Sequence, residues 1–412
     1  MILKLAAMLT SSRFTLVCAL LTAAIHLIET CSASDAAKPQ ARVSEVAKRM
    51  QDFVNDGTIS GAVTLVAQRG KAARLEAVGL ADIANRKPMR ADNLFWIASM
   101  TKPITAVAVL MLQDEGKLSV NDPVERFLPE FKGQWMIETR AGDHLSLVKP
   151  PRPITVQDLL THTAGLGDVP APRPDCSLAE LVMAYSQQPL RFLPGSKWEY
   201  SNPGINTLGR IVEVVSCERF ERFLEKRILK PLAMRDTTFW PSSDQARRLA
   251  KSYKPAATGK GLEETPVYFV KGGLSDRKRT PIPAGGLFST ARDVGNFYQM
   301  MLDGGEFRGK RLLSLASVGQ MTKTQTGDIT TGFVDGMSWG LGFQVVKQPQ
   351  GVTAMLSPGT FGHGGAYATQ SWAHPKRNLI LVLMIQRAGF QNGDASPVRK
   401  AFQESAVAAA KE

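Results

Sequence analysis

The hydrophobic and polar positions near the start of the chain predict one amphipathic helix, a hairpin and one buried helix. Apolar residues recur at helical spacing over 43–54, and the stretches 62–68 and 74–79 alternate as two paired strands do. Residues 104–112 are apolar almost all round, a pattern typical of a buried helix, and Pro103 fits its first turn.

The middle of the chain is rich in Pro and Gly and predicts helices joined by loops. The clearest helical patterns cover 155–161, 177–185, 207–217 and 291–302. The stretch 254–283 predicts a long irregular loop, a feature that is often functional in a compact protein.

Strand patterns return towards the C-terminus and precede a last helix: 339–346, 366–372 and 379–385, then 397–410. Strands at both ends of the chain predict one sheet with a helical region inserted in it. We expect a single domain over 43–412, with the sheet in 43–98 and 330–412 and helices in 99–329.

The N-terminus has the pattern of a signal peptide over 1–33. Basic residues precede an apolar run at 14–28, and small residues at 32–34 offer a cleavage site. The run is shorter than the about 20 residues that a membrane span needs. We therefore expect export to the periplasm or the medium, a linker over 34–42, and a mature chain that does not span a membrane.

Composition favours a globular protein with a basic surface. The chain has 412 residues, 44% of them hydrophobic, and a formal net charge of +13. Its basic clusters lack the interleaved aromatic residues of a nucleic-acid platform, so we expect no nucleic-acid partner. A positive surface is compatible with an anionic cell wall as a partner. Cys176 and Cys217 remain after the signal, and their spacing leaves both a disulfide and two separate thiols open.

Several familiar catalytic patterns are missing. The chain has no G-x-S-x-G, which removes support for a nucleophile-elbow hydrolase. Its histidines lack the spacing of a metal site such as H-E-x-x-H, so no metal is expected. We expect His162 to be structural at a helix end and His374 to lie in a surface turn.

Ser-x-x-Lys is present and points to a nucleophile. It starts at Ser99, Ser146 and Ser275, but only Ser99 stands at the mouth of a buried helix. There, residues i and i+3 share a face, so the amine of Lys102 can reach the Ser99 hydroxyl. Burial would lower the pKa of Lys102 and allow its neutral amine to take the serine proton. A helix-capping serine beside a solvated lysine is the alternative.

Two further patterns suit such a site. Tyr200 and Asn202 form the chain's one Tyr-x-Asn, where a tyrosine can serve as a second base and an asparagine can hold a substrate amide. His363, Gly364 and Gly365 precede the predicted strand at 366–372, where glycines allow substrate to approach closely. A packed tyrosine, a capping asparagine and an ordinary loop histidine remain the alternatives.

In this order the three motifs resemble the serine beta-lactamase and penicillin-binding protein superfamily. The likeness is greatest to its class C beta-lactamase-like branch, with esterases, D-aminopeptidases and D-Ala-D-Ala carboxypeptidases. The matching segments are 96–102, 159–166, 194–195, 200–202, 284–290 and 363–365.

The resemblance implies an α/β fold of the beta-lactamase/transpeptidase type, with an antiparallel sheet flanked by helices and an all-helical region beside it. It implies Ser99 as nucleophile, Lys102 as base, Tyr200 in proton transfer and Asn202 in orienting the substrate. The backbone N–H groups of Ser99 and Ala366 would form the oxyanion hole. The reaction would be two-step acyl transfer without a cofactor.

The third motif departs from the family pattern. Many beta-lactamases have Lys-Thr-Gly there, and the lysine helps to hold the drug's carboxylate, whereas His363 is at most partly charged near neutral pH. We therefore expect an esterase- or peptidase-like hydrolase acting on a small ester, a beta-lactam or a D-amino-acid peptide. The alternatives are a class C-type beta-lactamase and a non-catalytic protein of the same fold that binds cell-wall peptides.

Overall fold

The computed structural model describes residues 44–69, 73–173, 175–267 and 272–410. The predicted signal peptide and linker therefore lie outside the described residues. None of the described helices is both long and apolar enough to cross a bilayer.

The largest element is an eight-stranded antiparallel sheet built from both ends of the chain. Its strand order is β12-β13-β14-β15-β16-β1-β2-β3. The N-terminal strands are β1 (Gly61–Gln68), β2 (Arg74–Asp82) and β3 (Lys87–Pro88). The C-terminal strands are β12 (Met337–Trp339), β13 (Gln344–Val346), β14 (Phe361–Gly364), β15 (Gln370–His374) and β16 (Leu379–Met384). The two groups join where β1 pairs with β16, from Val63 opposite Met384 to Gln68 opposite Leu379.

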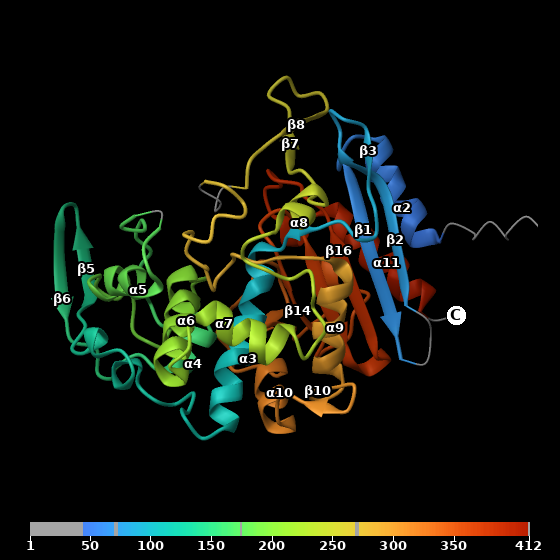
Figure 1. The fold of residues 1–412 in the computed structure, drawn as a ribbon. Coiled ribbons are helices and arrows are strands. Elements are labelled where there is room, and N and C mark those ends of the chain that lie inside the picture. The colour runs from blue at the N-terminus through green and yellow to red at the C-terminus, as the bar shows by residue number, and fades with distance from the viewer. Residues whose placement is uncertain (1–43, 70–72, 174, 268–271, 411–412) are drawn as a thin grey trace, which may run out of the picture. The chain divides into compact units, whose positions relative to one another are not determined.

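Strand β16 is buried on both of its faces, which explains its unbroken apolar sequence. One set of its side chains joins the hydrophobic cluster under α2 (Glu45–Asn55) and α11 (Pro397–Ala409): Leu379, Leu381 and Leu383. The other set joins the main core on the opposite face, where α9 (Ala291–Leu302) packs: Ile380, Val382 and Met384. The sheet thus lies between two helical layers (Figure 1).

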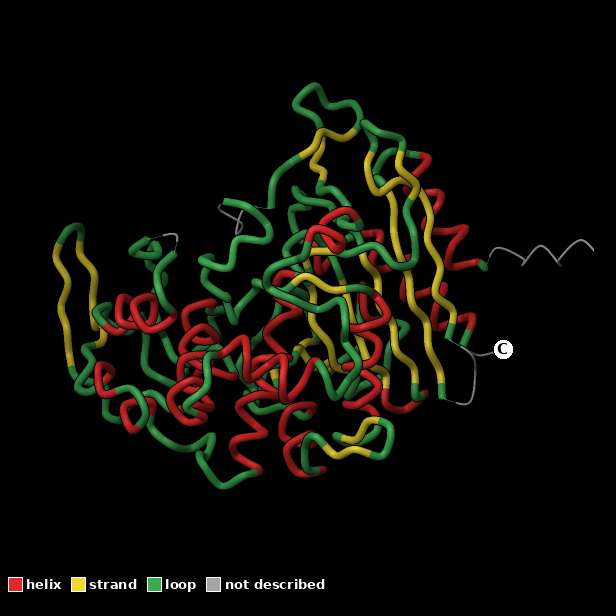
Figure 2. The backbone as a smooth tube through the Cα atoms, in the orientation of Figure 1, coloured by secondary structure: helices red, strands yellow, loops and turns green. Residues whose placement is uncertain are grey.

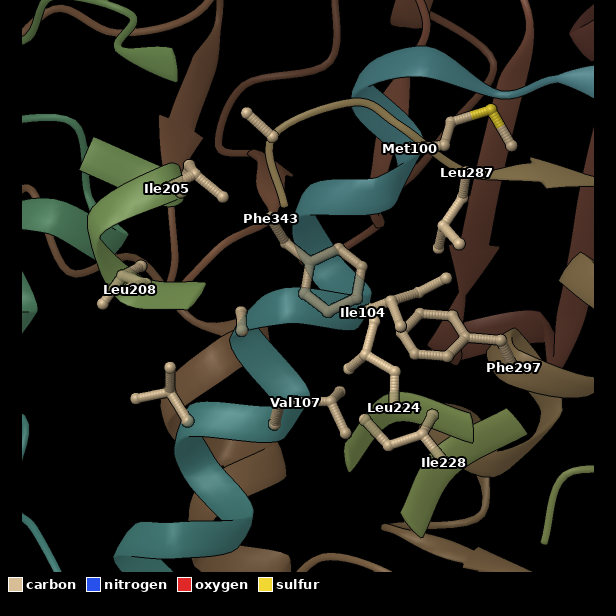
Figure 3. Packing of buried hydrophobic residues seen from close by; sticks show 14 of the residues in the cluster. Met100, Ile104, Val107, Ile205, Leu208, Leu224, Ile228, Leu287, Phe297 and Phe343 are labelled. Carbon is tan, nitrogen blue, oxygen red and sulfur yellow. The ribbon is translucent and has the colours of Figure 1, made fainter. Parts of the chain in front are cut away.

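The main core surrounds α3 (Thr101–Asp114), in which twelve consecutive residues from Thr101 to Leu112 are buried. Figure 3 shows Ile104 and Val107 of α3 packed among Leu224, Ile228 and Phe297. A helix enclosed in this way cannot rotate or slide without opening cavities, so the residues at its N-terminus have defined positions.

The remaining helices include a group, α4 to α6, on the side of α3 away from the sheet (Figure 1). They are α4 (Val156–Leu160), α5 (Leu178–Ser186), α6 (Asn202–Ser216), α7 (Phe220–Leu224), which continues as a π-helix over Glu225–Leu229, α8 (Ser243–Arg247) and α10 (Leu315–Thr322). Four short antiparallel strand pairs interrupt the loops between the helices (Figure 2). These pairs are β5 (Met136–Ala141) with β6 (His144–Val148), β7 (Tyr253–Pro255) with β8 (Leu262–Glu264), β4 (Phe95–Trp96) with β9 (Phe288–Ser289), and β10 (Glu306–Phe307) with β11 (Lys310–Arg311).

The predicted fold class is confirmed, but four local predictions are wrong. The segment 339–346 is not one strand: it holds the end of β12 and all of β13, which pair antiparallel across the turn at 340–343. The segment 366–372 is not one strand: β14 ends at Gly364, a turn follows, and β15 begins at Gln370. His374 lies at the end of β15 with its side chain fully buried, not in a surface turn. The helix expected over 207–217 begins earlier, at Asn202, because the Ser201 hydroxyl accepts a hydrogen bond from the Gly204 N–H and caps it.

The two cysteines of the described chain are free thiols, so the disulfide alternative is not realised. Cys176 is buried and Cys217 is exposed at the end of α6. The alternative of two separate thiols holds, although only one of them is buried.

Truncating a buried side chain of β16, which is buried on both faces, should destabilise the protein. Leu381→Ala removes a fully buried side chain and should lower the free energy of unfolding by about 2–5 kcal/mol because a cavity remains. Leu315→Ala is the matched control, since Leu315 is 70% exposed on α10, and should change it by about 0.5 kcal/mol or less. Denaturant titration of both variants measures the difference, and equal losses would contradict the two-sided burial of β16.

Candidate active site

Ser99 lies on a tight turn directly before α3. The turn is a 3₁₀ helix over Ala98–Met100, and Ala98 has a φ of +47°, in the left-handed region that non-glycine residues seldom adopt. The Thr101 hydroxyl donates to the Ala98 carbonyl at 2.7 Å. The Ile97 N–H donates to the Leu287 carbonyl at 3.0 Å. These bonds hold the turn and leave Ser99 only partly buried.

Lys102 connects Ser99 to two other segments. Its Nζ donates to Ser99 Oγ at 3.1 Å, to Asn202 Oδ1 at 2.8 Å and to the Ala284 carbonyl at 2.6 Å. The side chain is fully buried. This burial holds the pKa of Lys102 well below the ordinary lysine value, because the charged form loses its hydration. A neutral amine within reach of a serine hydroxyl can accept the proton of that hydroxyl.

Tyr200 lies beside this amine on the loop that leads into α6. Lys102 Nζ is 4.7 Å from the centroid of the Tyr200 ring. Asn202 is the first residue of α6, so the Ser201 cap places the tyrosine and the asparagine on either side of the helix start. Ser99, Tyr200 and Asn202, which were predicted as site residues, therefore all lie around Lys102 Nζ.

His162 holds the backbone on both sides of Tyr200. Its carbonyl accepts from the Glu199 N–H at 3.0 Å, and its Nδ1 accepts from the Ser201 N–H at 3.1 Å. Its ring centroid is 4.6 Å from that of Tyr200. Burial, followed by the nearby charge of Lys102, lowers the pKa of His162 well below its usual value, so the ring stays neutral and can accept. His162 is therefore structural, as expected, but what it positions is Tyr200.

The segment 283–285 was not predicted to contact Lys102 through its backbone. Besides the Ala284 carbonyl on Lys102, the Pro283 carbonyl accepts from the Thr105 hydroxyl at 2.9 Å, and the Gly285 carbonyl accepts from Trp96 Nε1 at 2.7 Å. Backbone carbonyls are present at every residue, so no side-chain pattern could have singled this segment out.

His363 closes the other side of the site from β14. Its ring is buried, with Nδ1 at 2.7 Å from the Gly364 carbonyl, and its centroid is 6.1 Å from that of Tyr200. Burial, followed by the charge of Lys102, lowers the pKa of His363 to about 4. At neutral pH the third motif therefore carries an uncharged imidazole.

Gly365 brings the turn after β14 against the nucleophile segment. A Cβ on Gly365 would lie 2.6 Å from the Ile97 carbonyl oxygen. Glycine is needed here because nothing larger fits between the two backbones. Ala366 follows on the exposed side of the turn. Glycines therefore matter at the end of β14 and not, as predicted, at the start of a strand.

No metal-binding group of three or more His, Cys, Asp or Glu residues occurs within the described part of the chain. The arrangement around Ser99 consists of a hydroxyl, a buried amine, a phenol, an amide and backbone groups. These groups can carry out nucleophilic and proton-transfer chemistry.

Comparison with known proteins identifies the family. A family model described as Beta-lactamase matches residues 46–403. Protein Rv1367c of Mycobacterium tuberculosis (strain ATCC 25618 / H37Rv) is 34% identical over 84% of this chain and 90% of its own length. Esterase EstB of Burkholderia gladioli is 28% identical over 93% of this chain and 99% of its own. The solved structure of EstCE1, described as a hydrolase with promiscuous acyltransferase activity, has a TM-score of 0.71 at 24% identity, covering 88% of this chain and 97% of that one.

The fold and these matches define a protein of the beta-lactamase/transpeptidase class. The chain belongs to the beta-lactamase family, and it is a serine hydrolase related to esterases and D-alanyl-D-alanine carboxypeptidases.

A methyl group at Gly365 should disable the site without unfolding the protein. Gly365→Ala would push the turn away from Ile97, and a displacement of about 1 Å can cost about 100-fold in rate. We expect ester hydrolysis to fall by that order while the melting temperature changes little. Gly319→Ala is the matched control, because a Cβ there would meet nothing within 4 Å. Unchanged hydrolysis in Gly365→Ala would contradict the tight approach.

Proposed function

We propose that the protein hydrolyses uncharged carboxylic esters by two-step acyl transfer through Ser99. The observation that carries the proposal is the fully buried amine of Lys102, 3.1 Å from Ser99 Oγ and with a pKa lowered by burial. Esterase EstB, similar over nearly the whole chain, supports the ester as substrate class.

In the first step, Ser99 Oγ attacks the ester carbonyl carbon as Lys102 Nζ takes the hydroxyl proton. The carbonyl π electrons move to the carbonyl oxygen, and the backbone N–H groups of Ser99 and Ala366 donate hydrogen bonds to the negative charge that develops there. Asn202 orients the acyl group. The C–O bond to the alcohol then breaks. The proton passes from Lys102 through Tyr200 to the alcohol oxygen, leaving an acyl-Ser99 ester. Lys102, acting through Tyr200, then takes one proton from a water whose oxygen attacks the acyl carbonyl carbon. The carbonyl re-forms as the C–O bond to Ser99 breaks, the carboxylic acid leaves, and the proton taken from water returns to Ser99 Oγ.

The third motif, with the neutral imidazole of His363, favours an uncharged substrate. With the pKa of His363 at about 4, its imidazole is neutral at pH 7. It therefore offers no positive charge to the carboxylate of a penicillin, whereas a lysine would. A neutral ester needs no such partner, so we place ester hydrolysis ahead of beta-lactam hydrolysis.

Two chromogenic substrates test this choice. Wild type should hydrolyse p-nitrophenyl butyrate and leave nitrocefin almost intact, and Ser99→Ala should lose ester turnover by at least about 1,000-fold, because the attacking oxygen is gone. Fast nitrocefin cleavage by wild type would instead favour a beta-lactamase. Undiminished ester turnover in Ser99→Ala would remove Ser99 from the mechanism.

The pH profile tests the role of Lys102. Because the amine must be neutral to accept a proton, kcat/KM should rise with pH through the pKa of Lys102, at a pH well below the ordinary value of 10.5. Lys102→Arg keeps a cation but cannot lose its proton in this range, so it should be inactive at every pH. A rise centred near 10.5, or an active Lys102→Arg enzyme, would contradict the proposal.

A further inference from the structure

An exposed aromatic ring stands next to the proposed proton donor. Phe333 is 37% exposed, and its ring meets that of Tyr200 edge to face at a centroid distance of 4.9 Å. Phe333 lies just before β12 and Tyr200 just before α6, so the two rings come from segments far apart in the chain. Large apolar side chains left open to water beside a reactive group commonly mark a binding surface.

Phe333 belongs to a continuous aromatic wall, by which we mean Phe333, Trp198 and Trp339. The ring of Trp198 is 5.7 Å from that of Phe333 and 5.2 Å from that of Trp339, which is fully buried. Both separations lie in the range in which aromatic rings attract one another. The wall therefore runs from the core to the surface along one side of Tyr200.

The loop that carries Phe333 is held by hydrogen bonds at Phe333 itself and just after it. Before the turn into β12, Asn392 Nδ2 donates to the Phe333 carbonyl at 2.7 Å. Beyond Phe333, the Gly336 carbonyl accepts from the N–H groups of Lys347 and Gln348 at 2.8 and 2.9 Å. A ring held in place before substrate arrives loses little conformational entropy on binding.

The position of the wall indicates which part of an ester it would contact. In the proposed mechanism Tyr200 delivers the proton to the leaving oxygen, so the group attached to that oxygen lies beside Tyr200. Phe333 and Trp198 are the rings on that side, whereas Asn202 and the turn after Gly365 serve the acyl group. Their uncharged faces suit an aromatic ring, which gains both burial and edge-to-face contact.

We propose that Phe333 and Trp198 form a subsite for an aromatic group on the alcohol part of the ester. The subsite rests on the proposed ester hydrolysis and names its substrate class: esters of arylalkyl alcohols.

Two acetate esters separate the subsite from the rest of the mechanism. Benzyl acetate and ethyl acetate form the same acetyl-Ser99, and they differ only in the ring next to the leaving oxygen. Wild type should prefer benzyl acetate in kcat/KM by about tenfold or more, and Phe333→Ala should lower kcat/KM for it by about tenfold. Ethyl acetate should lose less than about threefold, because it places no ring there. Titration of the released acetic acid measures both rates.

Three variants complete the design. Phe333→Leu keeps apolar bulk but no ring, so its loss on benzyl acetate should fall between those of wild type and Phe333→Ala. Phe333→Tyr keeps the ring and should restore the preference. Leu315 lies on α10 and is 70% exposed, so Leu315→Ala should behave as wild type on both esters.

Other outcomes would overturn the subsite. Equal losses on both acetates would mean that Phe333 only positions Tyr200. An unchanged preference, or a larger loss on ethyl benzoate than on benzyl acetate, would remove the ring from the alcohol side. Turnover of p-nitrophenyl butyrate by wild type reports ester hydrolysis separately: if it persists while ring selectivity is absent, only the subsite fails, and if it is absent, the proposed function fails.

Discussion

The burial of one lysine amine is the constraint on which the rest of the site depends. Lys102 Nζ has no access to water, and its hydrogen bonds run to oxygens of Ser99, Asn202 and Ala284. An amine removed from water needs hydrogen-bond partners in the protein. Without them its burial costs about 1–3 kcal/mol when it is neutral, and more when it is charged. The three segments therefore converge on the lysine, and the same burial favours the neutral form of the amine, which is the form that can accept a proton.

Three of the eight non-glycine residues with a positive φ in the described chain lie around the site. Ala98, His162 and Ala368 have φ values of +47°, +61° and +63°, although none of them is glycine. Each such residue costs on the order of 1–3 kcal/mol and persists only where the surroundings hold it. Here the buried helix α3, the bonds of His162 on both sides of Tyr200, and the turn between β14 and β15 supply that support. The site is thus a rigid arrangement imposed by the core.

The charge state of the site follows from the same burial. Desolvation lowers the pKa values of Lys102, His162 and His363 together, and the charge of Lys102 adds to the effect on both histidines. At neutral pH both imidazoles are therefore uncharged, and the amine of Lys102 loses its proton at a pH well below that of an ordinary lysine. These lowered pKa values link the proposed proton-accepting role of Lys102, the accepting Nδ1 of His162 and the proposed preference for an uncharged substrate.

The sequence alone determined those features that depend on the residue pattern of a single segment. The buried helix after Ser99, the i, i+3 placement of Lys102, the helix 291–302 and the strands at both chain ends are local, because periodicity reports which side of a segment is buried. Only the tertiary structure decided the Ala284 carbonyl on Lys102, the bonds of His162 to the neighbours of Tyr200, the turn at 365–369 and the burial of His374. These depend on which segments, far apart in the chain, lie side by side. The backbone groups and ring faces that make such contacts leave no periodic signal in the residues that carry them.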